Sequence, residues 1–156
     1  MDFCDKDAFE RVKEYGHGNG TNGFRELCGI RITALSPDGG AGEMPLGPQH
    51  LNPNGTVHGG ALYTLADTVA GHAAIAWAMA TTGRGADSLA CTTVTGSLNF
   101  LRPARGEKLV CLANCRKMGK TLAVLDVSIL DDRGQEVCAG SFTFYYIDRA
   151  RYVKQE

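Results

Sequence analysis

The sequence predicts an α+β fold in which one antiparallel β-sheet wraps around a long central helix. A helix-length apolar run rich in Ala and Gly extends from Gly59 to Ala80. Two segments with strand-like alternation precede this run, and four more follow it with short turns between them. A helix that is apolar on all sides needs a sheet to cover it, and alternating strands need a core for one face.

The chain has the size of one domain with an adequate hydrophobic core, since it has 156 residues of which 44% are hydrophobic. Residues 1–25 are expected to form an N-terminal helix and a Gly-rich loop. Residues 26–148 carry the sheet and the central helix, and residues 149–156 form a C-terminal tail.

The first elements are a short helix and a β-hairpin. A helix is predicted from Lys6 to Tyr15, where the glycine-rich stretch 16–20 ends it, and this segment is expected to act as a flap or docking piece. Alternation predicts strands at Leu27–Leu35 and Ala41–Leu46. The Pro, Asp and Gly residues of 36–40 are typical of the turn between them.

An irregular loop rich in Pro, Asn and Gly leads into the central helix, which should begin between Val57 and Gly60. Hairpin turns are predicted at 118–120 and 131–134, after the helix and its 81–87 connection. The strands predicted in this part are Leu89–Leu101, Lys108–Lys117, Thr121–Leu130 and Glu136–Ile147.

Charge and composition exclude several classes of function. The net charge is -1 and the sixteen Lys and Arg residues are scattered, so no nucleic-acid partner is expected. The apolar run is interrupted by Asp67, His72 and Trp77, which favours a buried helix over a membrane span.

The cysteines and histidines predict no metal site. The six cysteines form no CxxC pair and the N-terminus is charged, so reduced thiols and a cytoplasmic location are expected. Cys111 and Cys115 should face one side of a strand as small buried hydrophobes. His17, His50 and His58 lack metal-ligand spacing.

Asp67 is the one formally charged residue between His50 and Arg84. A carboxylate among that many apolar side chains loses several kcal/mol of hydration unless it is paired or used. It can cap or pair within the structure, but the polar residues that precede the helix favour a chemical role.

The motif Asn52-x5-His58-Gly59-Gly60-x6-Asp67 resembles the signature of the hotdog-fold acyl-CoA thioesterases of the PaaI type. Residues 97–109 are similar to the strand and turn that follow the central helix in that family, and residues 116–144 to its closing hairpins. The resemblance extends from about Leu27 to Ile147, so that residues 26–148 are expected to be a hotdog thioesterase domain.

The resemblance implies hydrolysis of a coenzyme A thioester, with Asp67 as general base or nucleophile. Asn52, His58 and Gly59 match positions that bind the carbonyl or position water. Thr93 matches a hydroxyl residue that contributes in some relatives. CoA is part of the substrate, which is an acyl- or aryl-CoA, and no separate cofactor is implied.

Helix geometry predicts that two subunits share each site. Gly59 and Asp67 are eight residues apart, which corresponds to about 12 Å along a helix axis. One carbonyl near both groups therefore requires Gly59 from one subunit and Asp67 from another, in a homo-oligomer that is at least a dimer and is expected to be a tetramer. The Gly59 amide, at the helix N-terminus, would stabilise the oxyanion.

Other residues are weaker candidates for substrate binding. Gly60 belongs to the motif and Tyr63 lies within its span, although the position of Tyr63, like that of Trp77, favours packing in the core or an interface over substrate contact. His72 is expected to be a satisfied core or interface histidine. The candidates for binding the CoA phosphates are basic residues near strand ends and a hairpin turn, namely Arg102, Arg116, Lys117 and Lys120.

Two other functions use the same scaffold. A non-catalytic acyl-CoA binding module would keep Asp67 only to order the helix, which the presence of Asn52 and Gly59 disfavours. A hotdog hydratase or dehydratase would act on the acyl chain, but the His and acidic pair associated with that branch is absent from the pattern. The length and type of acyl group stay open.

Overall fold

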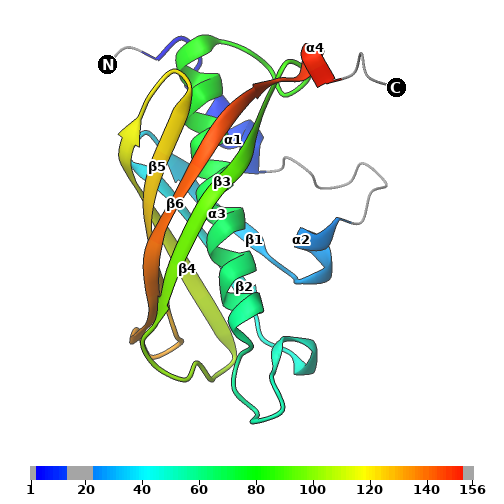
Figure 1. Cartoon of the computed structure of the whole chain (residues 1–156), viewed down its shortest axis with the longest axis vertical. Coiled ribbons are helices and arrows are strands. Elements are labelled where there is room, and N and C mark those ends of the chain that lie inside the picture. Colours follow the sequence, from blue (N-terminus) through cyan, green and yellow to red (C-terminus); the bar gives the residue numbers. More distant parts are fainter. Residues whose placement is uncertain (1–2, 14–22, 153–156) are drawn as a thin grey trace.

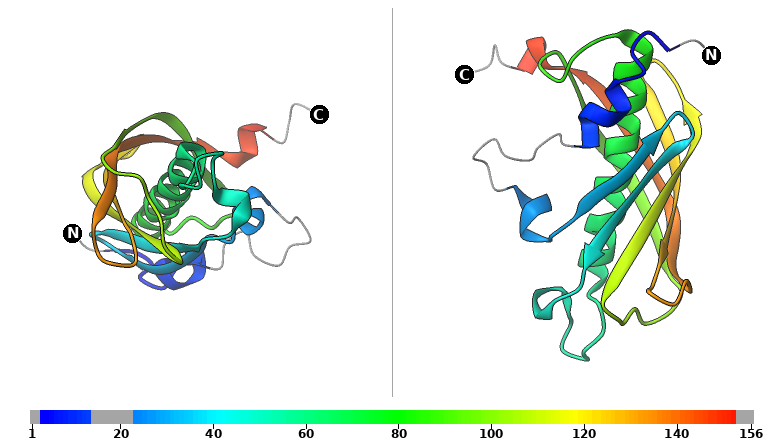
Figure 2. Two further views of the ribbon diagram at one scale, coloured as in Figure 1. Left: turned by 90° about the horizontal axis from the view of Figure 1, so that it is seen from below. Right: turned by 180° about the vertical axis from the view of Figure 1, so that it is seen from behind.

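A computed structural model describes residues 3–13 and 23–152 and shows the predicted α+β architecture (Figure 1). A six-stranded antiparallel sheet curves around the helix α3 (Gly59–Thr82), as the end-on view of Figure 2 shows. The strand order is β1-β2-β4-β5-β6-β3. The strands are β1 (Arg31–Ser36), β2 (Gly39–Pro45), β3 (Leu89–Phe100), β4 (Lys108–Met118), β5 (Leu122–Leu130) and β6 (Glu136–Asp148).

Small side chains allow α3 to lie close to the sheet. Ala66, Ala70 and Ala73 of α3 are fully buried. A Cβ atom at Gly42 of β2 would stand 2.6 Å from Val69, so the backbone of β2 approaches the helix directly. The apolar run thus forms a buried helix, and within the described ranges no helix is both long and apolar enough to cross a membrane.

The sheet shows the alternation that the sequence predicts. In β5, every second residue from Ala123 to Ile129 is buried against the helix side. The β1–β2 hairpin also forms, with Ser36 paired to Gly39 across a two-residue turn. Gly39 has φ 152°, and a Cβ there would lie 1.9 Å from the Ala113 carbonyl oxygen, so this turn requires glycine.

The two edge strands of the sheet, β1 and β3, differ in whether another element packs on them. Helix α1 (Ala8–Lys13) packs on α3 and β1. Most side chains of β3, by contrast, are exposed in the single chain, and Val94 keeps 58% of its surface. The long edge strand β3 is therefore open to pairing with another strand.

The start of the first predicted strand is wrong. Leu27 belongs to a short helix, α2 (Phe24–Leu27), and is 73% exposed. The Cys28 and Gly29 amides donate to the carbonyls of Phe24 and Glu26, which closes this helical turn. Gly29 then takes φ 66°, the left-handed conformation that ends helices, and the strand follows it.

The remaining boundaries need smaller adjustments. The N-terminal helix is confirmed over Ala8–Lys13, and residues 14–22, with their glycine string, lie outside the described residues. The loop before α3, predicted to be irregular, contains a 3-10 turn, η1 (Pro48–His50). A short helix, α4 (Arg149–Tyr152), begins the predicted tail.

The cysteines are free thiols, and Cys111 is buried as predicted while Cys115 is half-buried. The two belong to β4, in which a bulge after Cys115 shifts the pairing with β5. No group of metal-binding side chains exists among the residues that the structure describes.

Candidate active site

Gly59, Tyr63 and Asp67 form a stripe at four-residue intervals along the side of α3 that faces β3. Each member of the stripe meets a residue of β3. The Phe100 ring lies 3.3 Å from where a Cβ of Gly59 would stand, and the Thr93 hydroxyl donates to Asp67 Oδ1 at 2.7 Å. A bulge between Thr93 and Thr95 keeps both Thr93 and Phe100 on the helix side of the strand.

Asp67 is a half-buried carboxylate with one hydrogen-bond partner among the residues that the structure describes. Burial raises its pKa above the ordinary value, and the hydrogen bond from Thr93 partly opposes that rise. Among the described residues, no Lys, Arg or His forms an ion pair with it. The group is thus a carboxylate whose basicity is increased by an apolar environment.

Cys91 lies beside this carboxylate but is not a second nucleophile. Its Sγ contacts the Gly71 carbonyl oxygen at 3.6 Å, on the helix side of β3. Burial, with a smaller contribution from the negative charge of Asp67, raises the pKa of Cys91 to about 12. The thiol therefore stays protonated at neutral pH.

His58 caps the N-terminus of α3. Its Nδ1 accepts a hydrogen bond from the Gly60 amide at 2.9 Å, and its carbonyl accepts from the Ala61 amide at 2.9 Å. Within the described chain, the Gly59 amide has no acceptor, so it is the free donor of the first turn. Only Nε2 of the His58 ring is left for a substrate or water.

Asn52 organises the loop that leads to this cap. Its Oδ1 accepts from the Asn54 and Thr56 amides at 2.9 and 3.2 Å, and its Nδ2 donates to Thr56 Oγ1 at 2.8 Å. The Val57 amide of this loop donates a hydrogen bond to the Ala104 carbonyl at 3.0 Å. In the single chain, the polar groups of Asn52 therefore hold the loop in shape.

His50 is a positioning residue that the sequence analysis considered only as a metal ligand. It is buried, with Nδ1 accepting from the Gly47 amide at 3.0 Å and Nε2 within 3.0 Å of the Cys28 carbonyl oxygen. Its own carbonyl accepts from the His58 amide at 2.8 Å. The proximity of Pro48 and Gly47 signals a turn, but no sequence pattern shows this long-range contact.

The structure joins some of the predicted site residues and separates others. It brings Thr93 to Asp67, and it gathers Asn52, His58 and Gly59 at the N-terminus of α3. The two groups are about two helical turns apart, because Gly59 and Asp67 belong to one regular helix.

The four predicted phosphate-binding cations do not form one cluster. Arg102 follows β3 at the Gly59 end of α3, whereas the β4–β5 hairpin with Lys117 and Lys120 lies at the opposite end (Figure 1). Arg116 is engaged by Asp126 at 3.1 Å. In one chain, therefore, Arg102 cannot join the hairpin lysines at a single phosphate.

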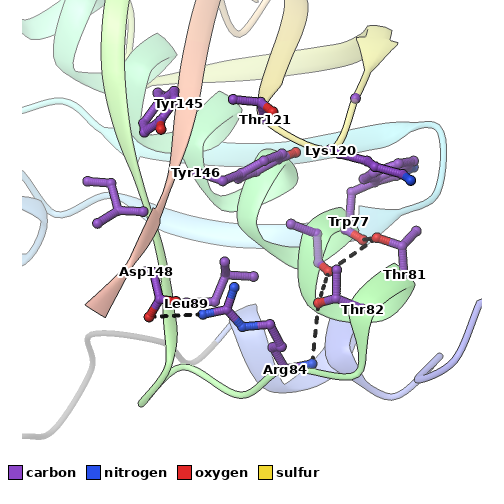
Figure 3. Close-up of a pocket in the computed structure, with 13 residues that line it drawn as sticks. Trp77, Thr81, Thr82, Arg84, Leu89, Lys120, Thr121, Tyr145, Tyr146 and Asp148 are labelled. Carbon is purple, nitrogen blue, oxygen red and sulfur yellow. Dashed lines mark hydrogen bonds and ion pairs between the residues drawn. The ribbon is translucent and has the colours of Figure 1, made fainter. Parts of the chain in front are cut away.

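A cavity of about 800 Å³ lies at the C-terminal end of α3 and includes Lys120 in its lining (Figure 3). Arg84, which forms an ion pair with Asp148 at 3.3 Å, also lines the cavity, and Trp77 and Tyr146 are among its aromatic lining residues. No local sequence pattern predicts this cavity, because its lining comes from five separate segments: α3, the loop that follows it, β3, the β4–β5 hairpin and β6.

His72 is a satisfied histidine, as predicted. Its Nδ1 lies 2.7 Å from the Thr68 carbonyl oxygen and its Nε2 lies 3.1 Å from Arg25 Nη1. Arg25 also donates to the carbonyls of Ile30 and Lys13. This contact ties α2 to the central helix and takes His72 out of the candidate site.

Comparison with known proteins places the chain in a family. Residues 54–138 match the thioesterase superfamily. The chain is 31% identical to mouse acyl-coenzyme A thioesterase 13 over 121 residues, which cover 76% of this chain and 81% of the relative. It is 34% identical to the Escherichia coli acyl-coenzyme A thioesterase PaaI over 113 residues, which cover 72% and 74%.

Solved structures agree with the sequence comparison. The E. coli PaaI protein matches with a TM-score of 0.68 and 26% identity, covering 79% of this chain and 83% of that one. A hypothetical thioesterase from Streptococcus pneumoniae, solved with coenzyme A, matches with a TM-score of 0.65 and 26% identity, covering 76% and 86%.

The chain therefore belongs to the thioesterase superfamily and has the hotdog fold. Within that superfamily, its homologues are acyl-CoA thioesterases of the PaaI and acyl-coenzyme A thioesterase 13 type. The resemblance that the sequence motif indicated is confirmed.

Proposed function

We propose that this protein hydrolyses acyl- or aryl-CoA thioesters to the free acid and CoA, at sites that two subunits share. The observation that supports this function best is the half-buried Asp67 carboxylate, hydrogen-bonded to Thr93 in an otherwise apolar helix. The free Gly59 amide at a helix N-terminus supplies the complementary partial positive charge.

The chemistry needs only these two groups and water. The Gly59 amide polarises the thioester carbonyl, and Asp67 either takes a proton from the attacking water or attacks the carbonyl itself. In the water route, the tetrahedral intermediate expels the CoA sulfur, which receives the proton that Asp67 has taken. In the direct route, the CoA thiolate leaves as a mixed anhydride forms on Asp67; water then hydrolyses the anhydride, which frees the acid and Asp67 and supplies the proton that the CoA sulfur takes up. An oxyanion donor contributes roughly 3 kcal/mol and a general base about 10²–10⁴-fold in rate.

The open edge of β3 suggests how two subunits complete the site. Along β3, Thr93 is the residue that contacts Asp67 of the helix, and Phe100 is the residue that lies next to Gly59. If β3 pairs antiparallel with its copy, the Phe100 of the partner subunit comes opposite Thr93 when the two-fold axis lies near Gly96 and Ser97. This register brings Gly59 of the partner subunit toward Asp67.

The same register supports a place for CoA. It brings Arg102 of the partner subunit opposite Cys91, two residues from Leu89, which lines the cavity together with Arg84 and Lys120. Arg102 of the partner subunit would then join Arg84 and Lys120, which line the cavity within one chain, and the three cations could bind phosphates. Tyr146 lines the cavity and pairs in the sheet with Cys91, two residues before Thr93, so the cavity lies on the C-terminal side of Asp67 along α3.

The test is a hydrolysis screen of the purified protein against a panel of acyl- and aryl-CoA thioesters, monitored by release of free thiol. We expect turnover of at least one thioester and a loss of about 10² or more in kcat for Asp67→Asn. Asp126→Asn, an exposed carboxylate on β5, is the control and should keep wild-type activity.

The outcomes separate the alternatives. Wild-type turnover by a folded Asp67→Asn protein would refute the proposed mechanism. Tight binding of CoA thioesters without any CoA release would identify a binding module instead, and a modified acyl chain that stays attached to CoA would identify a hydratase or dehydratase.

A further inference from the structure

Tyr63 occupies the middle of the stripe, one helical turn from Gly59 and one from Asp67. Its ring packs edge-on against Phe142 of β6, with centroids 5.0 Å apart and planes at 62°. Its hydroxyl lies 2.4 Å from where a Cβ of Gly96 would stand on β3. Tyr63 therefore crosses the whole space between α3 and the edge strand.

Gly96 is the counterpart that makes room for this tyrosine. A side chain at position 96 would meet the Tyr63 hydroxyl and a Phe142 ring carbon, each at 2.4 Å. Since Gly96 has no positive φ, its backbone does not require glycine. The requirement comes from the bulk of Tyr63 and Phe142 above it.

The space on the two sides of Asp67 differs. Toward the C-terminal end of α3, the small residues Gly71 and Cys91 contact each other, and the Phe144 ring of β6 lies 3.3 Å from where a Cβ of Gly71 would stand. The large cavity lies beyond them, at the C-terminal end of the helix. Toward the N-terminal end, Tyr63 closes the space. If CoA occupies the cavity side, as proposed above, the acyl group of a thioester at Asp67 extends toward Tyr63.

We propose that Tyr63 is the wall of the acyl pocket and limits the substrates to compact acyl groups, so that long linear chains are excluded. This inference rests on the proposed thioesterase function and shared site. With the two-fold axis near Gly96, the Tyr63 side chains of the two subunits stand between the two sites of the dimer. Each wall therefore faces one acyl group, and 37% of Tyr63 is exposed to receive it in the single chain.

The experiment compares kcat/KM for butanoyl-, benzoyl- and dodecanoyl-CoA in wild type, Tyr63→Ala and Tyr63→Phe. We expect the wild type to prefer the two compact substrates, and Tyr63→Ala to raise the ratio of dodecanoyl to butanoyl activity about tenfold or more. Tyr63→Phe keeps the ring and should keep the wild-type preference, because the wall is steric. Leu112→Ala, an exposed truncation on β4, is the control for a general loss of side-chain volume.

If Tyr63→Ala does not fold, as judged by its thermal melting, Tyr63→Leu shortens the wall with less loss of packing and should shift the ratio in the same direction. A folded Tyr63→Ala or Tyr63→Leu enzyme with the wild-type chain-length profile would overturn the inference. So would a wild type that hydrolyses dodecanoyl-CoA as well as butanoyl-CoA. Failure of the proposed function has a different result, which is that the wild type releases CoA from no substrate.

Discussion

The N-terminal end of α3 and the middle of α3 are held in opposite ways. Around Asn52 and His58 the chain is polar, and side chains and backbone amides satisfy one another within a short loop. Around Asp67 the surroundings are apolar, and within residues 3–13 and 23–152 the Thr93 hydroxyl is the one hydrogen-bond partner of the carboxylate. The first region offers a spare backbone donor, the Gly59 amide, and the second offers one basic acceptor.

The difference shows why neither region is a complete site. A self-satisfied loop fixes the Gly59 amide in position but supplies no base. A desolvated carboxylate supplies the base but stabilises no oxyanion. Because about 12 Å of helix separates them, the proposed reaction requires the two groups to come from different subunits.

The largest expected effect comes from removing the spare donor. Gly59→Pro deletes the amide hydrogen at the first position of a helix, where proline is well tolerated, and His58 already has the extended conformation (φ -65°, ψ 136°) that a residue before proline prefers. We expect kcat to fall by about 10²–10³-fold with little change in Tm.

Gly59→Ala is the matched control for this change. It adds a Cβ that meets the exposed Phe100 ring but keeps the amide. It should therefore lose far less activity than the proline variant. Equal kcat values for the two variants would show that the amide has no part in catalysis.

Mixing two inactive variants tests directly whether the Gly59 amide and the Asp67 carboxylate of one site come from different subunits. After subunit exchange, a heterodimer of Asp67→Asn and Gly59→Pro chains contains one intact site and one doubly defective site. Random exchange should therefore restore about a quarter of wild-type activity. Mixtures that demonstrably exchange subunits yet stay inactive would place both groups of each site in one chain.

Most of the fold could be predicted from the sequence because alternation and turn residues are local signals. The five strands from Gly39 onward begin and end within two residues of the prediction. The first strand was misplaced at Leu27, since a four-residue helical turn that ends at a glycine has no periodicity long enough to detect.

In the candidate site, too, contacts between distant segments could not be predicted from local patterns. The Thr93–Asp67 contact was anticipated only through the family resemblance, since it depends on a bulge in β3 that no local pattern reveals. The Tyr63–Gly96 pair and the cavity beside Lys120 combine distant segments, and both became apparent only from their packing.

Removing the Thr93 hydrogen bond is expected to have a smaller effect on activity, and this effect depends on pH. Thr93→Val removes the donor that opposes the raised pKa of Asp67, so the pKa should rise further. Because the active form is the carboxylate, activity is lost as the pH falls through this pKa, and the acid limb of the kcat/KM profile should move to higher pH. Thr93→Ser keeps the donor and should retain the wild-type limb. If the acid limb of the kcat/KM profile lies at the same pH in all three proteins, the Thr93 hydroxyl does not influence the pKa of Asp67.

The smallest effect is expected from the loop, where Asn52 acts through hydrogen bonds to its own neighbours. Asn52→Ala removes the acceptor for the Asn54 and Thr56 amides and should lower the free energy of unfolding by about 1–3 kcal/mol, measured by urea denaturation. Asn52→Asp keeps that acceptor and should keep most of the stability. If Asn52→Asp is as stable as the wild type but loses activity as strongly as Gly59→Pro, then the Asn52 amide contacts the substrate or the attacking water as well. In that case the polar region would contribute two amide donors to the site, the Gly59 backbone amide and the Asn52 side chain, whereas the Asp67 region would contribute one acceptor.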